Sequence, residues 1–281
     1  MKNLNSYPLN SFEFHENAIT TKKLTKSDKD IRTRLTALNG QIESLYKTYK
    51  TNFDTNSLEN IKAHGYEDNE KLDLLSLYNY KSKIIQAFKA GITTTATNRI
   101  INTCQNCTIG EVSSFDHVLP KEEFAEFVIN PLNLFPCCSV CNSSKGKYWR
   151  VNGERLYLNL YLDDLPPLQY LFVNIGFVDN TFTTEFYLDN RNGVDPTLFA
   201  LIERHYTRLK LLKRFSDNND LVIPTLQNKI SPYIGKLPLN DIIDTTIVQI
   251  QLNRELFGFN YWQSILELEL INNQKFIEQL T

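Results

Sequence analysis

The sequence predicts an α+β protein that is mainly helical, with a small β-hairpin in its C-terminal half. Apolar residues recur at helical spacing over residues 27–49 and 70–90, and again in several segments after residue 196. Residues 168–190 instead read as two short strands joined by a turn. Residues 101–150 lie between these regions and hold nearly all of the recognisable chemistry, including all five cysteines.

Length and charge leave several protein classes open and exclude others. The 281 residues are 42% hydrophobic, which is enough for one large domain or two small ones. A formal net charge of -2 does not indicate a globally basic nucleic-acid binder, although a local basic surface stays possible. No segment approaches about 18 uninterrupted apolar residues, and the first residues have no apolar core of the signal-peptide type. We therefore expect a cytoplasmic protein with no membrane partner.

The N-terminal segment, residues 1–95, is expected to be an irregular arm followed by two helices. Residues 1–26 are polar and mixed, which favours the arm. The second helix is expected from about residue 70 to 90, with Gly91 as its stop, and Ser27 or Asp28 is expected to cap the first. The apolar residues of the first helix follow alternating steps of four and three: Ile31, Leu35, Leu38, Ile42, Leu45 and Tyr49.

The C-terminal segment, residues 156–281, is expected to be helical apart from one hairpin. The two strands within 168–190 should turn at Asp179-Asn180, because these residue types tolerate the backbone of a tight turn. Helices are expected over residues 197–215, 241–256 and within 260–277.

Two C-x-x-C pairs predict a structural zinc site. Cys104 pairs with Cys107, and Cys138 pairs with Cys141. Four thiolates presented from two tight turns form the tetrahedral set that zinc prefers. Cysteines of a reducing compartment bind metal or act in catalysis more often than they form disulfides. Cys137 is left over, and we interpret it as a small buried apolar residue.

The motifs around these pairs resemble those of the HNH endonucleases, or His-Me finger nucleases, in their zinc-stapled four-cysteine form. C-x-x-C is followed by D-H-x-x-P-K, then by N-L, then by C-x-x-C-N-x-x-K-G. The resemblance covers about 50 of the 281 residues. In that family a ββα-metal motif, made of a short hairpin and one helix, holds a catalytic divalent ion. The resemblance implies such a module over residues 96–155 and metal-dependent cleavage of nucleic acid, with DNA as the expected substrate.

The resemblance also assigns a role to individual residues. His117 matches the general base of the first strand, and Asp116 matches the adjacent metal ligand. Asn133 matches the middle residue of the family name, whose side chain holds the loop that orients the histidine. Asn142 matches the metal ligand on the helix, so the chain reads H-N-N instead of H-N-H. Lys145 matches a common lysine, expected either to contact substrate phosphate or to pack at the helix end.

The proposed chemistry requires these residue types. Hydrolysis of a phosphodiester needs a water made nucleophilic near neutral pH, and an imidazole with an ordinary pKa of about 6.5 can take its proton. A hard cation stabilises the charge that develops on the phosphate. Asp116 and Asn142 supply oxygen ligands, which suit Mg²⁺ or Mn²⁺. The sequence therefore predicts two metals, a structural zinc and a catalytic divalent ion.

Several alternatives stay open. The zinc-stapled module could bind nucleic acid or a protein without catalysis, and the two asparagines could form turns or caps. A basic segment within 203–215 could contact phosphate or form a solvated helix face; its members are Arg204, Arg208, Lys210, Lys213 and Arg214. No G-x-x-x-x-G-K-[ST] motif is present. The resemblance extends to effector nucleases of prokaryotic antiviral defence, which implies an ATPase or sensor subunit encoded separately as a partner.

Overall fold

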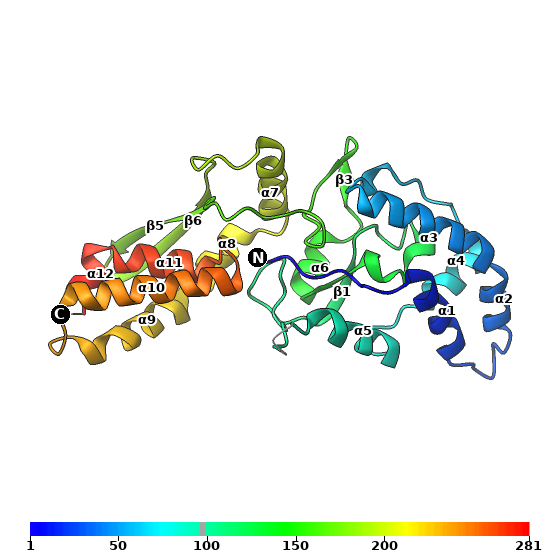
Figure 1. The fold of residues 1–281 in the computed structure, drawn as a ribbon, viewed down its shortest axis with the longest axis horizontal. Coiled ribbons are helices and arrows are strands. Elements are labelled where there is room, and N and C mark those ends of the chain that lie inside the picture. Colours follow the sequence, from blue (N-terminus) through cyan, green and yellow to red (C-terminus); the bar gives the residue numbers. More distant parts are fainter. Residues whose placement is uncertain (96–98, 281) are drawn as a thin grey trace. The chain divides into compact units, whose positions relative to one another are not determined.

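A computed structural model describes residues 1–95 and 99–280 (Figure 1). It shows an α+β protein that is about half helical, with small antiparallel hairpins, and this confirms the predicted class. The chain divides into two compact units. We call Asn3–Asn106 with Gly110–Asp164 the N-terminal unit, and Met1–Lys2, Cys107–Ile109 and Leu165–Thr281 the C-terminal unit. The division into three segments that we expected from the sequence, residues 1–95, 96–155 and 156–281, stays a prediction.

The N-terminal unit holds the following helices in chain order: α1 (Ser11–Thr21), α2 (Ile31–Ala37), α3 (Asn39–Asp54), α4 (Asp68–Leu75), α5 (Lys83–Thr93) and α6 (Ser139–Lys145). Its strands form two hairpins: β1 (Ser114–His117) with β2 (Leu134–Cys137), and β3 (Arg150–Val151) with β4 (Glu154–Arg155). Short 3-10 turns cover Leu58–Asn60, Ala125–Phe127 and Pro131–Asn133.

The expectation of an irregular arm over residues 1–26 was wrong, because α1 lies within it. The Asn10 side chain caps this helix by accepting from the backbone N–H groups of Phe12 and Glu13. Phe14 and Ala18 face the core one helical turn apart, with Ile19 beside them. The cap and this apolar spacing were present in the sequence, but the mixed polarity around them obscured the pattern.

Each of the two long helices expected over residues 27–90 is interrupted. The first changes direction at Leu38 between α2 and α3, where the Leu38 N–H bonds the carbonyl of Leu35 in a tighter turn. Its cap position is Asp30, while Asp28 forms an ion pair with Arg34. The second breaks between α4 and α5, and α5 continues through Gly91 to Thr93.

Tertiary contacts of two tyrosines explain the break between α4 and α5. The Tyr78 hydroxyl accepts from the backbone N–H of Phe115, and the Tyr80 hydroxyl donates to the carbonyl of Val112. Both partners lie in or just before β1, far along the chain. A continuous helix would direct the two tyrosines about 200° apart, since successive residues rotate by about 100°. The irregular 76–82 segment lets both reach the hairpin.

The core of the N-terminal unit surrounds the β1–β2 hairpin. In the antiparallel register Asp116 pairs with Phe135 and His117 with Leu134. Phe115 stacks on Phe88 of α5 with ring centroids 5.1 Å apart. The hairpin is thus buried among helices, and α6 follows β2 directly and lies beside β1 (Figure 1).

The C-terminal unit combines one hairpin with helices, as expected: β5 (Leu171–Val178), β6 (Thr181–Leu188), α7 (Pro196–Arg208), α8 (Leu211–Asp217), α9 (Val222–Ile230), α10 (Leu239–Phe257), α11 (Trp262–Ile271) and α12 (Gln274–Glu278). Short 3-10 turns cover Asn219–Leu221 and Ser231–Tyr233. The turn at Asp179-Asn180 is confirmed, with φ of 50° and 59°. The helices over 241–256 and 260–277 are also present, the latter split into α11 and α12.

The helix expected over residues 197–215 is two helices, so the basic segment does not lie on one of them. Lys210 adopts a left-handed backbone with φ of 53° and separates α7 from α8. Lys213 forms an ion pair with Asp217, and Arg214 donates to the carbonyl of Leu209. The five cations therefore do not share one helix face.

An aromatic core holds the C-terminal unit together. Phe215 and Trp262 stack with ring centroids 5.5 Å apart, and Phe186 of β6 meets both edge-on. Asn260 accepts from the backbone N–H groups of Tyr170 and Leu171, which ties the start of β5 to the segment before α11. Over the described residues, none of the helices combines the length and the apolar character that crossing a membrane requires.

Candidate metal centre and active site

Four buried cysteines converge on one point. The sulfurs of Cys104, Cys107, Cys138 and Cys141 all lie within 4.8 Å of one another. A tetrahedral zinc with Zn–S bonds of about 2.3 Å places its sulfurs about 3.8 Å apart, so the cluster needs only a small contraction to bind the ion. The thiolate donor set and its burial fit zinc. The predicted pairing of the cysteines is confirmed by this cluster.

Local backbone geometry prepares both turns for sulfur ligands. Cys138 is the N-cap of α6, and its Sγ accepts from the backbone N–H of Cys141 at 3.4 Å. The other turn closes when the Cys104 N–H donates to the carbonyl of Gly110 at 2.8 Å. A Cβ at Gly110 would lie 3.0 Å from the Cβ of Cys138, so a side chain there would push the two turns apart.

Cys137 lies outside the cluster, as expected. It is fully buried at the end of β2, and its Sγ lies 3.4 Å from the Oγ of Ser114. Burial raises the pKa of the Cys137 thiol well above its ordinary value, and the nearby carboxylate of Asp116 adds to this effect. Cys137 is therefore a protonated thiol packed in the core.

The side chains of α6 and β1 face one another in two pairs. Ser114 and Asp116 are two residues apart on β1 and share one face, while Asn142 and Lys145 are three apart on α6 and share another. The Nδ2 of Asn142 donates to the Oγ of Ser114 at 3.3 Å. The Nζ of Lys145 donates to both carboxylate oxygens of Asp116, at 2.9 and 2.8 Å.

Lys145 also donates to the backbone carbonyls of His117 and Val118, at 2.6 and 3.3 Å. The lysine is 5% exposed and Asp116 is 9% exposed, so the ion pair is shielded from water. Burial raises the pKa of Asp116 above its ordinary value, and the charge of Lys145 offsets part of this rise. The structure thus uses Lys145 to tie the end of α6 to the end of β1.

The ring of His117 lies on the opposite face of β1 from Asp116, because successive strand residues alternate. Its Nε2 lies 2.9 Å from the carbonyl oxygen of Val128, and the ring of Tyr78 contacts it edge-on at 4.8 Å. A carbonyl partner requires a proton on Nε2, which leaves Nδ1 as the unprotonated nitrogen. Burial is the main cause that lowers the pKa of His117 to about 3; the bond to Val128 opposes this shift, and the charges of Lys121 and Lys145 add to it.

Asn133 binds the loop that precedes it in the chain. Its Oδ1 accepts from the backbone N–H of Leu119 at 2.7 Å, and its Nδ2 donates to the carbonyls of Leu119 and Phe127. The hydroxyl of Tyr49 adds a fourth bond, to Oδ1. This loop carries Val128, so Asn133 holds the carbonyl against which His117 is oriented.

The structure therefore pairs Asn142 with Ser114 and Lys145 with Asp116 along one face of β1, and places His117 on the other face of the strand. Asp116 and Asn142 have the oxygen chemistry that a hard divalent ion requires. Sequence reasoning missed Ser114 and Val128. Ser114 could have been found from the two-residue period of the strand, whereas a backbone carbonyl leaves no signal in residue identity.

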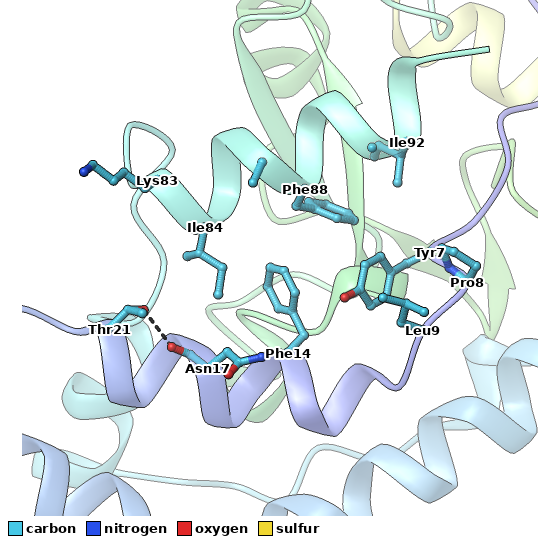
Figure 2. A pocket seen from close by; sticks show the side chains of 12 residues that line it. Tyr7, Pro8, Leu9, Phe14, Asn17, Thr21, Lys83, Ile84, Phe88 and Ile92 are labelled. Atoms are coloured by element: carbon cyan, nitrogen blue, oxygen red, sulfur yellow. Dashed lines mark hydrogen bonds between the residues drawn. The ribbon is translucent and has the colours of Figure 1, made fainter. Parts of the chain in front are cut away.

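A cavity of about 630 Å³ lies elsewhere in the N-terminal unit, between α1 and α5. Figure 2 shows Phe14 and Phe88 projecting into it from the two helices, with Tyr7 and Leu9 at one end. Lys83 and Tyr7 are its titratable lining residues, and none of the predicted site residues lines it. The cavity is therefore separate from the Asp116 site.

Comparison with known proteins gives one partial likeness. Over 80 residues the chain is 32% identical to protein ea31 of Escherichia phage lambda, a stretch that covers 28% of this chain. That stretch is 27% of the phage protein, so the chain matches about a quarter of this relative's length. No family model and no solved structure matches the sequence.

Proposed function

We propose that the chain is a metal-dependent HNH endonuclease that hydrolyses phosphodiester bonds of nucleic acid, with DNA as the expected substrate. One observation carries the proposal: β1, β2 and α6 follow one another as a hairpin and a helix, which is the order of a ββα-metal motif. The D-H pair ends the first strand, and the helix begins at the cysteine cluster.

The cysteine cluster supports the proposal by positioning α6. Cys138 and Cys141 lie in the first turn of the helix, one turn before Lys145 and directly before Asn142. A zinc bound there would fix where the helix begins, and hence where Asn142 stands relative to β1. We assign the zinc this structural role only.

The contacts of His117 set the tautomer and orientation that a general base requires, whereas its burial lowers its pKa and so weakens it as a base. Val128 accepts from Nε2 and so sets the tautomer, which leaves the Nδ1 lone pair to take a proton from water. Asn133 holds the loop that carries Val128. Asp116 and Asn142 would hold a divalent ion through oxygen. When bound, that ion would supply positive charge to the phosphate and the leaving oxygen.

The test is cleavage of plasmid DNA by His117→Ala and by the natural chain, with Mg²⁺ and with EDTA. We expect the variant to lose cleavage by at least about 100-fold, within the usual contribution of a general base. Zinc content should be unchanged. The melting temperature should fall by a few degrees, because the buried carbonyl of Val128 loses its partner at a cost of about 1–3 kcal/mol. His64→Ala, at an exposed histidine outside this site, is the control for the substitution itself.

Normal cleavage by His117→Ala would refute the proposal at its centre. One observation favours the alternative of a non-catalytic binding module, namely that Lys145 already engages both oxygens of Asp116. That alternative predicts nucleic-acid binding that persists in EDTA, without cleavage under any divalent ion. An assay of binding and cleavage on the same preparation separates the two functions.

We further propose a role as an effector in antiviral defence, acting with a separately encoded ATPase or sensor subunit. This extension rests on the resemblance of the motifs alone. Expression of the chain with the products of its neighbouring genes, followed by co-purification and phage challenge, tests it. Full protection by the chain alone would remove the need for a partner subunit.

A further inference from the structure

Lys145 is an unusual lysine because its ammonium group is buried and fully engaged. It donates to both oxygens of Asp116 and to the carbonyls of His117 and Val118. An ammonium has three protons and no acceptor, so these four oxygens exhaust its bonding capacity. Burying a charged group is costly unless an opposite charge compensates it, and Asp116 provides that charge.

The same carboxylate is the strongest ligand available to a divalent ion at this site. The second donor, Asn142, is neutral and lies one turn before Lys145 on α6. A divalent cation at Asp116 would therefore stand close to the ammonium of Lys145. Two positive groups repel strongly at such distances when water is excluded. The single negative charge of Asp116 cannot compensate both the ammonium and a divalent ion.

The end of α6 allows the lysine to change partners without unfolding the helix. Lys145 is the last residue of α6, and Gly146 follows with φ of 54°, a left-handed value that terminates the helix. The flexible four-carbon stem of Lys145 can rotate about its own bonds while Asn142 keeps its bond to Ser114.

We propose that Lys145 is an internal counter-ion of Asp116 and competes with the catalytic divalent ion for that carboxylate. Binding of the ion then requires the ammonium to leave Asp116. This inference rests on the proposed function, since it takes Asp116 to be the metal ligand. Its consequence is that Lys145 weakens metal binding and keeps the site closed to the ion until enough metal is present.

The first experiment measures Mn²⁺ binding to the full-length chain with its zinc retained, by electron paramagnetic resonance of the free ion. Lys145→Met removes the charge and keeps most of the stem. We expect it to bind Mn²⁺ about 10-fold more tightly than the natural chain, within the usual range of coupling between two sites. Lys147→Met, at an exposed lysine two residues on, should bind as the natural chain does. Equal or weaker binding by Lys145→Met would overturn the inference.

A second measurement avoids the variant, which is useful if loss of Lys145 disrupts the fold. Reductive methylation of the natural chain, mapped by mass spectrometry, reports the accessibility of each lysine. We expect Lys145 to be protected without added divalent ion and to become several-fold more reactive with saturating Mg²⁺, while Lys147 does not change. Continued protection of Lys145 would show that the ion and the lysine bind Asp116 at the same time. That result would refute the proposed competition.

The outcomes also separate this inference from the proposed function. Cleavage that depends on His117 and Mg²⁺, together with unchanged Mn²⁺ affinity in Lys145→Met, would refute the competition and leave the nuclease intact. If that variant also cleaved slowly at saturating Mg²⁺, Lys145 would instead act on the substrate. Absence of Mn²⁺ binding in every form, with no cleavage, would refute both proposals. Mn²⁺ binding that Asp116→Asn abolishes, without cleavage, would refute the nuclease alone.

Discussion

Replacement of Asn133 by alanine should strongly destabilise the loop between β1 and β2. The substitution removes four hydrogen bonds made by a side chain with no exposed surface. Two partners keep another bond: the Tyr49 hydroxyl still reaches the carbonyl of Leu132, and the Phe127 carbonyl still accepts from the N–H of Asn130. The N–H and carbonyl of Leu119 lose the bonds that Asn133 supplies.

The magnitude follows from these two backbone groups of Leu119. A buried polar group left without a partner costs about 1–3 kcal/mol. Two such groups, with some loss of packing, should lower the free energy of unfolding by about 4 kcal/mol. Asn130 offers a matched control, because it is equally buried in the same loop and accepts only from the N–H of Leu132. Asn130→Ala leaves the N–H of Leu132 without its acceptor but also removes a buried Nδ2 that has no partner, so it should cost only about 1 kcal/mol.

Urea unfolding of both variants measures the difference. The midpoints should separate by an amount that corresponds to about 3 kcal/mol, with slopes that match the natural chain. Far-ultraviolet circular dichroism at zero urea checks that both variants fold. If the two variants were destabilised within about 1 kcal/mol of one another, the bonding of Asn133 would not control the loop, and our account of its role would be wrong.

Three further predictions concern other parts of the chain. Cys138→Ala should lose the zinc and the fold around it, whereas Cys137→Ala should keep the zinc and lose about 1 kcal/mol; the reverse zinc contents would show that the wrong cysteine was assigned. Burial lowers the pKa of His15 to about 4. Asn39 offsets this shift only in part, because no hydrogen bond in good geometry joins the two side chains. The unfolded chain therefore takes up the proton at a higher pH than the folded chain does. Stability should therefore drop by about 3 kcal/mol between pH 6.5 and 4, and His15→Phe should lose that share of the pH dependence, as urea unfolding at both pH values would reveal. Asn180→Val should destabilise the chain by about 1–2 kcal/mol, since its φ of 59° crowds a β-branched side chain, whereas Asn180→Gly should not; equal thermal melting of the two would contradict this turn.

The sequence by itself determined the features that depend on a few adjacent residues. The C-x-x-C spacing identified Cys138 as the ligand in place of Cys137, because both sulfurs of such a pair come from one turn of chain. The turn at Asp179-Asn180 followed from residue types that tolerate a positive φ between two strands. Such signals are complete within a short segment, so no distant contact is needed to interpret them.

Only the tertiary structure decided the features that depend on partners far along the chain. The break between α4 and α5 exists because Tyr78 bonds to β1, and helical periodicity alone gives no sign of that bond. The pairing of Lys145 with Asp116 likewise depends on how α6 lies against β1. The residue pattern alone did not decide whether the Lys145 side chain contacts substrate or packs at the helix end. Its burial beside the largely buried carboxylate of Asp116 makes it a counter-ion, because a buried ammonium requires a compensating negative charge.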